Sequence, residues 1–416
     1  MSSCPSGAQG SPPAAFTVAD IFRKHGDSFL RSAALSAEEL RAFNDIINCR
    51  TATFGGHVYR CNRCGYECQL YNSCRNRHCP TCQGLAQAEW LEARKAELLP
   101  VPYFHNVFSL PHEFNDLALA NKVCFYNLLF RSVSEILLEF GRRKLKGTLG
   151  VILILHTWDQ QLSYHTHLHA LIPHGALAFD GKKWNRPVSD SFLFDVKELG
   201  AAWRTCFLKH LRNEYRRGKI RIPGSMKALR SADAFERFLD APSQKTWVVF
   251  SRGSLAGPEY ALEYLSRYTR RVAISNSRIL DLTEDQVTIS YLDRKRGNVR
   301  RELELTPHQF MSRFFLHILP WNFYRIRHYG IFANCVKARL LSLALVALDE
   351  FPVMEKPRKK EHTEWLLLLT GIDVTRCPKC LEGQMECVEE IPAPALPKRI
   401  KVVDVSAFTR APPTKA

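Results

Sequence analysis

The pattern of apolar and polar positions is most regular in the middle of the chain. Residues 149–155 form a run of branched apolar side chains that predicts a buried strand. A second strand follows and continues through residue 172, with histidines at positions 165, 167 and 169. Because successive side chains of a strand point to opposite faces, the three imidazoles share one face and could bind a metal ion. The alternative is an edge strand that happens to be rich in histidine.

A further histidine stands at the end of the first of these strands. His156 precedes His167 by eleven residues, and the connection between the strands covers only residues 158–162. A connection this short brings the two strand ends together. We therefore expect His156 to join His167 and His169 as the third ligand, while the role of His165 stays open.

Other segments predict helices and strands around this pair. Apolar residues recur at helical spacing in segments 19–32, 36–47, 86–99, 117–140, 203–217, 232–239, 306–319 and 333–348. Further strands are predicted at 102–111, 247–250, 286–291 and 299–305. The order of strand, helix and paired hairpin indicates an α+β fold with a central antiparallel sheet and flanking helices. The longest apolar helix, 117–140, contains charged residues and is not a membrane span.

A cysteine-rich segment precedes the predicted sheet. Two C-x-x-C pairs are separated by 14 residues, a spacing at which two knuckles share one tetrahedral zinc: Cys61, Cys64, Cys79 and Cys82. Four more residues could close a second, interleaved zinc site: Cys49, His57, Cys74 and His78. The alternative for the second set is that the histidines face phosphate or solvent and that the Cys74 thiol packs in the core.

A half knuckle lies near the C-terminus. Cys377 and Cys380 have the same spacing, and Cys387 could be a third ligand, but no fourth ligand is evident. These spacings favour metal-bound thiolates in a reducing compartment over disulfides. The N-terminus lacks a basic region followed by an apolar run, so we expect no signal peptide and a cytoplasmic protein.

The charge balance indicates a polyanionic partner. The chain has 58 Lys and Arg against 41 Asp and Glu, a formal net charge of +17. Arginines stand between the predicted zinc ligands, among them Arg75 and Arg77, so the cysteine-rich module would present cations on a rigid frame suited to DNA.

A pair of tyrosines suggests nucleophiles. Tyr264 and Tyr268 lie one helical turn apart in a segment opened by Gly257 and Pro258. The same segment carries Arg267, Arg270 and Arg271. A tyrosine oxygen that attacks a phosphodiester beside a histidine-bound cation would form a phosphotyrosine link. Seen alone, such a pair is more often packed in a core, but a zinc module, a histidine strand and a tyrosine helix in this order favour the catalytic interpretation.

In these features the sequence resembles the two-tyrosine HUH transposases of rolling-circle insertion sequences, the family of insertion sequence ninety-one. The His-hydrophobic-His motif is matched by residues 167–169, and the resemblance extends over segments 71–80, 155–158, 264–275 and 325–330. It implies an HUH endonuclease domain behind a zinc-binding domain. It also implies His167 and His169 as metal ligands, and Tyr264 and Tyr268 as nucleophiles that nick single-stranded DNA through a 5′-phosphotyrosine.

Composition, ligand chemistry and the resemblance together give the expected cofactors, partners and domains. Mg²⁺ or Mn²⁺ would occupy the histidine site and Zn²⁺ the cysteine sites, with element ends and target DNA as partners. The domains expected are a disordered leader (1–15), a helical and zinc-binding domain (16–98), a nuclease domain (99–330), a helical C-terminal region (331–384) and a disordered tail (385–416). The alternatives are an HUH replication initiator or relaxase, or a non-enzymatic zinc-dependent DNA-binding regulator.

Overall fold

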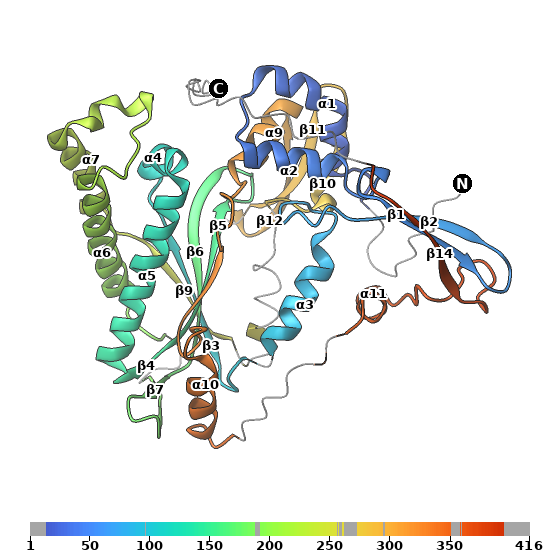
Figure 1. The fold of residues 1–416 in the computed structure, drawn as a ribbon. Helices are drawn as coiled ribbons and strands as arrows, with labels where there is room; N and C mark the ends of the chain where they lie inside the picture. The colour runs from blue at the N-terminus through green and yellow to red at the C-terminus, as the bar shows by residue number, and fades with distance from the viewer. Residues whose placement is uncertain are drawn as a thin grey trace.

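An antiparallel sheet lies at the centre of the protein. The computed structural model describes residues 14–95, 97–187, 192–255, 257, 260–261, 273–293, 296–350, 358 and 360–394. The central sheet has five strands in the order β13-β5-β6-β3-β9 (Figure 1). They are β3 (Tyr103–Ser109), β5 (Gly150–Trp158), β6 (Tyr164–Pro173), β9 (Val249–Leu255) and β13 (Ile326–Gly330). The two strands predicted to carry the histidines, β5 and β6, are neighbours inside this sheet.

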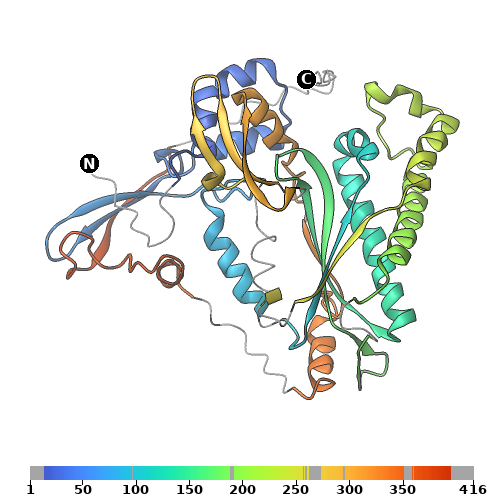
Figure 2. The same ribbon diagram turned by 180° about the vertical axis from the view of Figure 1, so that it is seen from behind.

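Two long helices cover one face of the sheet. α5 (Lys122–Lys144) and α6 (Val196–Arg216) lie side by side there, together with α4 (Asn115–Ala120) and α7 (Ala232–Gln244) (Figures 1 and 2). Even-numbered residues of β6, such as the fully buried Leu168, point into the largest apolar core between the sheet and these helices. The alternation predicted from the sequence thus assigns one face of β6 to the core.

The helix predicted over 117–140 is divided in two. The break falls at Asn121, where the backbone leaves the helical region between α4 and α5. The Asn121 side-chain amide donates to the carbonyl oxygens of Leu117 and Arg221, at 2.9 and 2.7 Å. The bond to Leu117 occupies a carbonyl that a continuous helix would bond to the Asn121 N–H, and the bond to Arg221 ties the break to a segment 100 positions away.

The opposite face of the sheet carries the odd-numbered residues of β6. Leu171 packs there with Ile152 and Ile154 in a smaller buried cluster, closed by side chains of α10 (Lys337–Val346). Helix α3 (Gln83–Lys95) runs along the same side (Figure 2). The histidines of β6 share this face, toward the end of the strand that joins β5.

A second core connects the N-terminal helices to a later part of the chain. Phe22 of the first helix stacks on Phe43 and Phe315, with ring centroids 5.4 Å apart in both pairs. A small antiparallel sheet completes this core. The sheet consists of β10 (Ile279–Leu282), β11 (Val287–Asp293) and β12 (Val299–Leu305). The helices of this core are α1 (Val18–Ser32), α2 (Ala37–Ile47) and α9 (Pro307–Leu316). The N-terminal helices and the first cysteines therefore share one core with residues 273–318 rather than forming a separate unit.

A three-stranded arm extends away from the body (Figure 1). It consists of β1 (Gly56–Cys61), β2 (Glu67–Tyr71) and β14 (Met385–Ile391), with β14 and β2 on either side of β1. The expectation that the chain is disordered from residue 385 onward is wrong for β14, because this segment pairs with β1 along its whole length. The rest of that predicted tail, from residue 395, and most of the predicted leader lie outside the described residues.

The remaining described elements are short. They include β4 (Gly147–Thr148), β7 (Ala176–Ala178), β8 (Trp184–Asn185), α11 (His362–Thr370) and four 3-10 helices at Ala52–Phe54, His112–Phe114, Gly224–Arg230 and Asn276–Arg278. Antiparallel sheets with flanking helices confirm the predicted α+β class. None of the helices in the described ranges is long and apolar enough to cross a membrane.

Candidate functional site

Three histidines converge on one face of the central sheet. His156 of β5 lies directly opposite His167 of β6, and directly opposed residues of antiparallel strands point to the same face. His169 follows two positions later and shares that face. One ring nitrogen of each histidine lies within 4.8 Å of the others. The structure thus brings together the three residues predicted as metal ligands, while His165, on the same face, lies outside this cluster.

Hydrogen bonds fix the orientation of the two β6 imidazoles. His167 Nδ1 lies 2.9 Å from the carbonyl oxygen of His165, so Nδ1 carries the proton and Nε2 keeps its lone pair. His169 Nδ1 lies 2.9 Å from Nε2 of His105 on β3. The Nε2 atoms of His167 and His169 face each other at 3.1 Å. Nδ1 of each ring is therefore occupied by a partner, and Nε2 faces the cluster.

His105 is a residue that the sequence reasoning missed. It is 5% exposed and lies opposite Leu171 of β6, hence on the histidine face. Its ring stacks on that of His169, with centroids 5.1 Å apart. The available signal was its place in the predicted strand 102–111, but the pairing of that strand with β6 could not be read from the sequence.

An aromatic side chain covers one side of the cluster. The Trp158 indole stacks on His156, with ring centroids 4.6 Å apart and an interplanar angle of 20°. The edge of the same indole meets His317, which is buried just after α9. Burial lowers the pKa of His317 to about 3, so this imidazole is neutral. The third ligand is thereby held between the sheet and a rigid apolar neighbour.

This donor set fits a divalent cation. Three imidazole ligands leave coordination positions open, as catalytic sites require, and hydrogen-bonded partners such as His105 are typical of histidine ligands. A cation held there could polarise a phosphodiester oxygen and neutralise developing charge.

The predicted nucleophiles and three predicted DNA contacts lie outside the described residues. These are Tyr264, Tyr268, Arg267, Arg270 and Arg271. The chain reaches them from β9, the edge strand beside β3. Ala261, three residues before Tyr264, is fully buried in the apolar cluster on the histidine face of the sheet.

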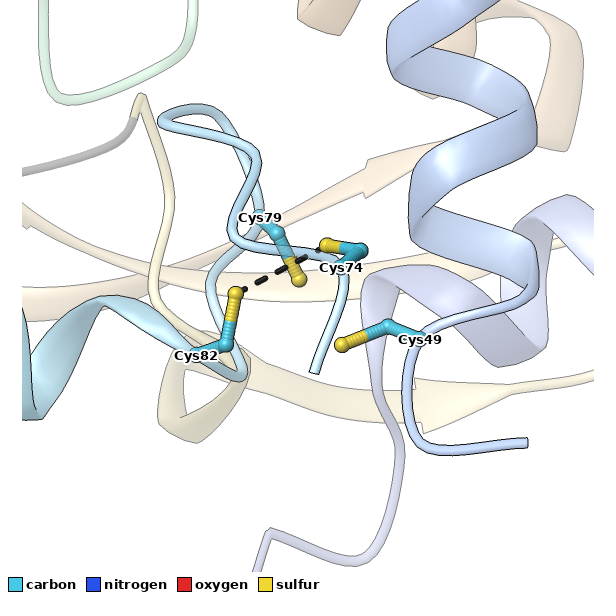
Figure 3. Close-up of side chains that lie close together, drawn as sticks. All are labelled: Cys49, Cys74, Cys79 and Cys82. Atoms are coloured by element: carbon cyan, nitrogen blue, oxygen red, sulfur yellow. Dashed lines mark hydrogen bonds between the residues drawn. The ribbon is translucent and has the colours of Figure 1, made fainter. Parts of the chain in front are cut away.

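The cysteines form two separate clusters. In the first, the thiols of four residues point toward one another between the end of α2 and the start of α3 (Figure 3). They are Cys49, Cys74, Cys79 and Cys82. The sulfurs of Cys74 and Cys82 lie 3.6 Å apart. The second cluster lies in the arm and contains Cys61, Cys64, Cys377 and Cys380.

The structure contradicts the predicted ligand sets. Cys61 and Cys64 lie at the tip of the β1–β2 hairpin, whereas Cys74 follows β2 at its base. A strand of six residues spans about 17 Å, so the two predicted knuckles cannot share one ion. Each knuckle instead meets cysteines that are distant in sequence. Neither His57 nor His78 belongs to a cysteine cluster.

The two histidines have other partners. His57 Nδ1 lies 3.8 Å from the sulfur of Cys387, the proposed third ligand of the C-terminal half knuckle, which also stays outside the clusters. His78 Nε2 accepts a hydrogen bond of 3.3 Å from the backbone N–H of Leu319. Spacing alone could not distinguish these roles from ligation.

Arg77 is bound within the protein. Its guanidinium donates to the carbonyl oxygens of Phe323 and Pro320, at 2.6 and 2.8 Å, and burial lowers its pKa. The expected contact of Arg77 with DNA is therefore at odds with the structure, where this side chain attaches the cysteine loop to the segment before β13. Arg75 is exposed and is held with a positive φ of 53°.

Comparisons with known proteins identify the family of this chain. The chain matches the family "Putative transposase" over residues 150–339 and the "Transposase zinc-binding domain" over residues 21–110. It is 39% identical over 377 residues to "Putative transposase y4qJ" of Sinorhizobium fredii, which covers 89% of this chain and 94% of the relative. It is 25% identical over 354 residues to "Transposase for insertion sequence element IS801" of Pseudomonas savastanoi pv. phaseolicola, with 84% of both chains covered.

The matched ranges coincide with the two kinds of site. The first contains the histidines of β5 and β6, and the second contains the whole cluster of Figure 3, whose four thiols fit Zn²⁺. Cys377 and Cys380 lie outside both ranges. The chain belongs to the IS91 family of transposases, with an N-terminal zinc-binding domain and an α+β domain of the HUH type.

Proposed function

We propose that this transposase nicks single-stranded DNA at the ends of an insertion sequence and transfers the cut strand to a target by a rolling-circle route. Tyr264 and Tyr268 serve as the nucleophiles, and His156, His167 and His169 hold Mg²⁺ or Mn²⁺. The observation that carries the proposal is the convergence of three histidine nitrogens within 4.8 Å on one face of the sheet. Membership of a transposase family supplies DNA as the substrate class.

Each DNA strand that is cut and covalently bound requires its own tyrosine nucleophile. The phenolic oxygen of a tyrosine attacks the phosphorus, a new O–P bond forms, and the bond to the 3′ oxygen breaks. The leaving oxygen takes up a proton and becomes a 3′-hydroxyl, while the 5′ phosphate stays on the tyrosine. Attack of a 3′-hydroxyl on this phosphotyrosine reverses the exchange and restores the phenol. Two tyrosines let the protein hold two 5′ ends in succession.

The divalent cation, when bound, supplies Lewis-acid stabilisation of the phosphodiester oxygens. The chain's own contribution is orientation. The carbonyl of His165 and the ring of His105 hold the two β6 imidazoles, and Trp158 holds His156. Mg²⁺ and Mn²⁺ suit phosphate chemistry and are the ions that we propose.

The positive charge of the chain supports DNA binding, and we propose that the DNA bound is single-stranded. The net charge of +17 makes binding salt-dependent. Arg75 remains a candidate for phosphate contact because it is exposed, and it lies beside the cysteine cluster of the zinc-binding domain. Arg267, Arg270 and Arg271 stay proposals of the same kind.

The test is a cleavage assay on an oligonucleotide of the element end, labelled at either terminus, with Mg²⁺ or Mn²⁺. We expect a nick with protein joined covalently to the 5′ phosphate. The adduct should disappear in the Tyr264→Phe/Tyr268→Phe double variant and in His167→Ala. His165→Gln is the matched control, because His165 lies on the same strand and face but outside the cluster.

Two outcomes would contradict the proposal. Cleavage that persists in the double tyrosine variant would exclude these nucleophiles. Equal loss of activity in His165→Gln and His167→Ala would contradict the assignment of His167, but not His165, as a metal ligand. Addition of a second, unlabelled target strand tests the transfer step, which a nuclease without strand transfer would not perform.

A further inference from the structure

The second cysteine cluster joins segments from opposite ends of the chain. Cys61 and Cys64 lie at the tip of the β1–β2 hairpin, and Cys377 and Cys380 lie just before β14. The sulfur of Cys61 is 3.7 Å from that of Cys380, and the sulfur of Cys64 is 3.6 Å from that of Cys377. The two pairs are separated by 319 and 313 positions in the sequence.

These distances are those of a tetrahedral metal site. Zinc–sulfur bonds of about 2.3 Å at tetrahedral angles place neighbouring sulfurs about 3.8 Å apart. A disulfide would require about 2.05 Å. The sulfurs in the arm therefore have the spacing of zinc ligands, as do those of Cys74 and Cys82 at 3.6 Å in the other cluster.

Both knuckles present backbone N–H groups to their sulfurs. The N–H groups of Arg63 and Cys64 point at Cys61 Sγ, both at 3.4 Å. In the C-terminal knuckle the N–H of Lys379 lies 3.4 Å from Cys377 Sγ, and the N–H of Gly383 lies 3.3 Å from Cys380 Sγ. Donors directed at a sulfur stabilise its thiolate, which is the form that binds metal.

We propose that Cys61, Cys64, Cys377 and Cys380 bind a structural zinc ion that clips the C-terminal strand β14 to the N-terminal hairpin. This site is additional to the zinc-binding domain matched at residues 21–110, because half of its ligands lie far outside that range. It does not depend on the proposed nuclease chemistry. The zinc-binding region of this transposase thus needs residues from both ends of the chain.

Backbone pairing and polar contacts, rather than apolar burial, attach the strand β14 to the hairpin. Five of its seven residues are exposed, so apolar burial contributes little to its attachment. Its described pairing partner is β1, so its attachment rests mainly on backbone pairing with that strand. A four-thiolate zinc adds free energy to this attachment. Loss of the ion should therefore release β14.

Gly383 lies close to the four-cysteine site. A Cβ added at Gly383 would lie 2.3 Å from the sulfur of Cys61 and 2.9 Å from the Cβ of Arg63. The Gly383→Val variant therefore crowds the site while all four thiols remain. It separates an effect on geometry from the simple removal of a ligand.

The experiment measures zinc per chain in the full-length protein by elemental analysis after dialysis against a metal-free buffer. Wild type should hold one zinc in each of the two cysteine clusters, in addition to any zinc at the histidine site. The Cys377→Ser/Cys380→Ser variant should hold one zinc fewer than wild type, as should Cys79→Ser/Cys82→Ser. Cys387→Ser is the matched control, because this exposed cysteine lies on β14 but outside the clusters, and it should keep both.

Amide hydrogen exchange provides the second measurement. In Cys377→Ser/Cys380→Ser and in Gly383→Val, the amides of β14 should lose protection while those of β5 and β6 keep theirs, which also shows that the variants are folded. The proposal is overturned if Cys377→Ser/Cys380→Ser retains as much zinc as wild type, or if β14 stays protected in it. It is also overturned if iodoacetamide alkylates Cys377 and Cys380 in the zinc-loaded wild type as fast as it alkylates Cys387.

Discussion

Nδ1 of His169 lies 2.9 Å from Nε2 of His105, a contact between the middle strand of the sheet and its neighbour β3. The bond orients His169 so that its Nε2 faces that of His167 at 3.1 Å. Such a partner also raises the basicity of a metal-binding imidazole. His105 is therefore expected to be a positioning residue for the metal site.

The first prediction concerns this bond. The His105→Ala variant should weaken Mn²⁺ binding by about 10- to 100-fold, because His169 loses its fixed orientation. His105→Gln retains an acceptor and should recover part of the affinity. Calorimetric titration with Mn²⁺ measures both. His174→Gln serves as control, since His174 is also buried beside the sheet but lies outside the cluster, and an equal loss there would contradict a specific role for His105.

The second prediction uses the alternation within the His-hydrophobic-His motif. Leu168 is fully buried in the core against α5 and α6, so Leu168→Ala should lower the free energy of unfolding by about 2–5 kcal/mol. His165→Ala on the opposite face, where the side chain is half-buried, should cost less, about 1 kcal/mol. Urea denaturation of the two variants makes the comparison. Similar destabilisation by both would mean that the two faces of β6 are not distinguished as described.

The third prediction concerns Arg77. Its guanidinium donates to two carbonyl oxygens in the segment before β13, so Arg77→Ala leaves these acceptors without their partner. Hydrogen bonds from a charged donor contribute about 1.5–3 kcal/mol each, and we expect a loss of stability of about 2–4 kcal/mol. Thermal unfolding measures the change.

Arg75→Ala is the control for Arg77. Arg75 is exposed, so its removal should leave stability nearly unchanged and instead weaken binding to single-stranded DNA. Binding isotherms at several salt concentrations record the second effect. If Arg77→Ala left stability unchanged and reduced the salt dependence of DNA binding, Arg77 would be the DNA contact and the structural role given to it here would be wrong.

The fourth prediction concerns pH. His317 Nε2 lies 3.1 Å from the carbonyl oxygen of Leu162 and its Nδ1 lies 3.2 Å from the Thr157 hydroxyl, and burial lowers its pKa from 6.5 to about 3. Below pH 6.5 the unfolded chain takes up a proton that the folded chain does not. The stability contribution is therefore complete above pH 6.5 and is lost as the pH falls toward 3, at up to about 1.4 kcal/mol per pH unit.

The measurement compares wild type with His317→Gln. Other groups, including the cysteine ligands, also take up protons in acid, but they do so in both proteins, so their effect cancels in the difference between the two unfolding free energies. The difference between the two unfolding free energies should shrink by about 1 kcal/mol per unit between pH 6 and pH 4. Parallel pH curves would show that His317 does not titrate in this way.

The sequence by itself determined the local features of this protein. The apolar run at 149–155 and the alternating histidines predicted β5 and β6, and the short connection predicted that His156 would meet His167. These relations involve neighbouring strands joined by a tight connection, for which the twofold repeat of a strand fixes which side chains share a face. The α+β class followed from the same patterns, and the motifs indicated the family.

Only the tertiary structure decided which distant segments meet. The partner of His169 comes from β3, and the cysteines of each knuckle have partners that spacing could not identify, Cys49 and Cys74 for one and Cys377 and Cys380 for the other. A C-x-x-C pair supplies half of a tetrahedral site, and its sequence does not specify the other half. Which cysteines complete the site depends on the pairing of segments hundreds of residues apart, here β14 with β1. Such pairing produces no periodic pattern in the sequence, so it could not be predicted from the sequence.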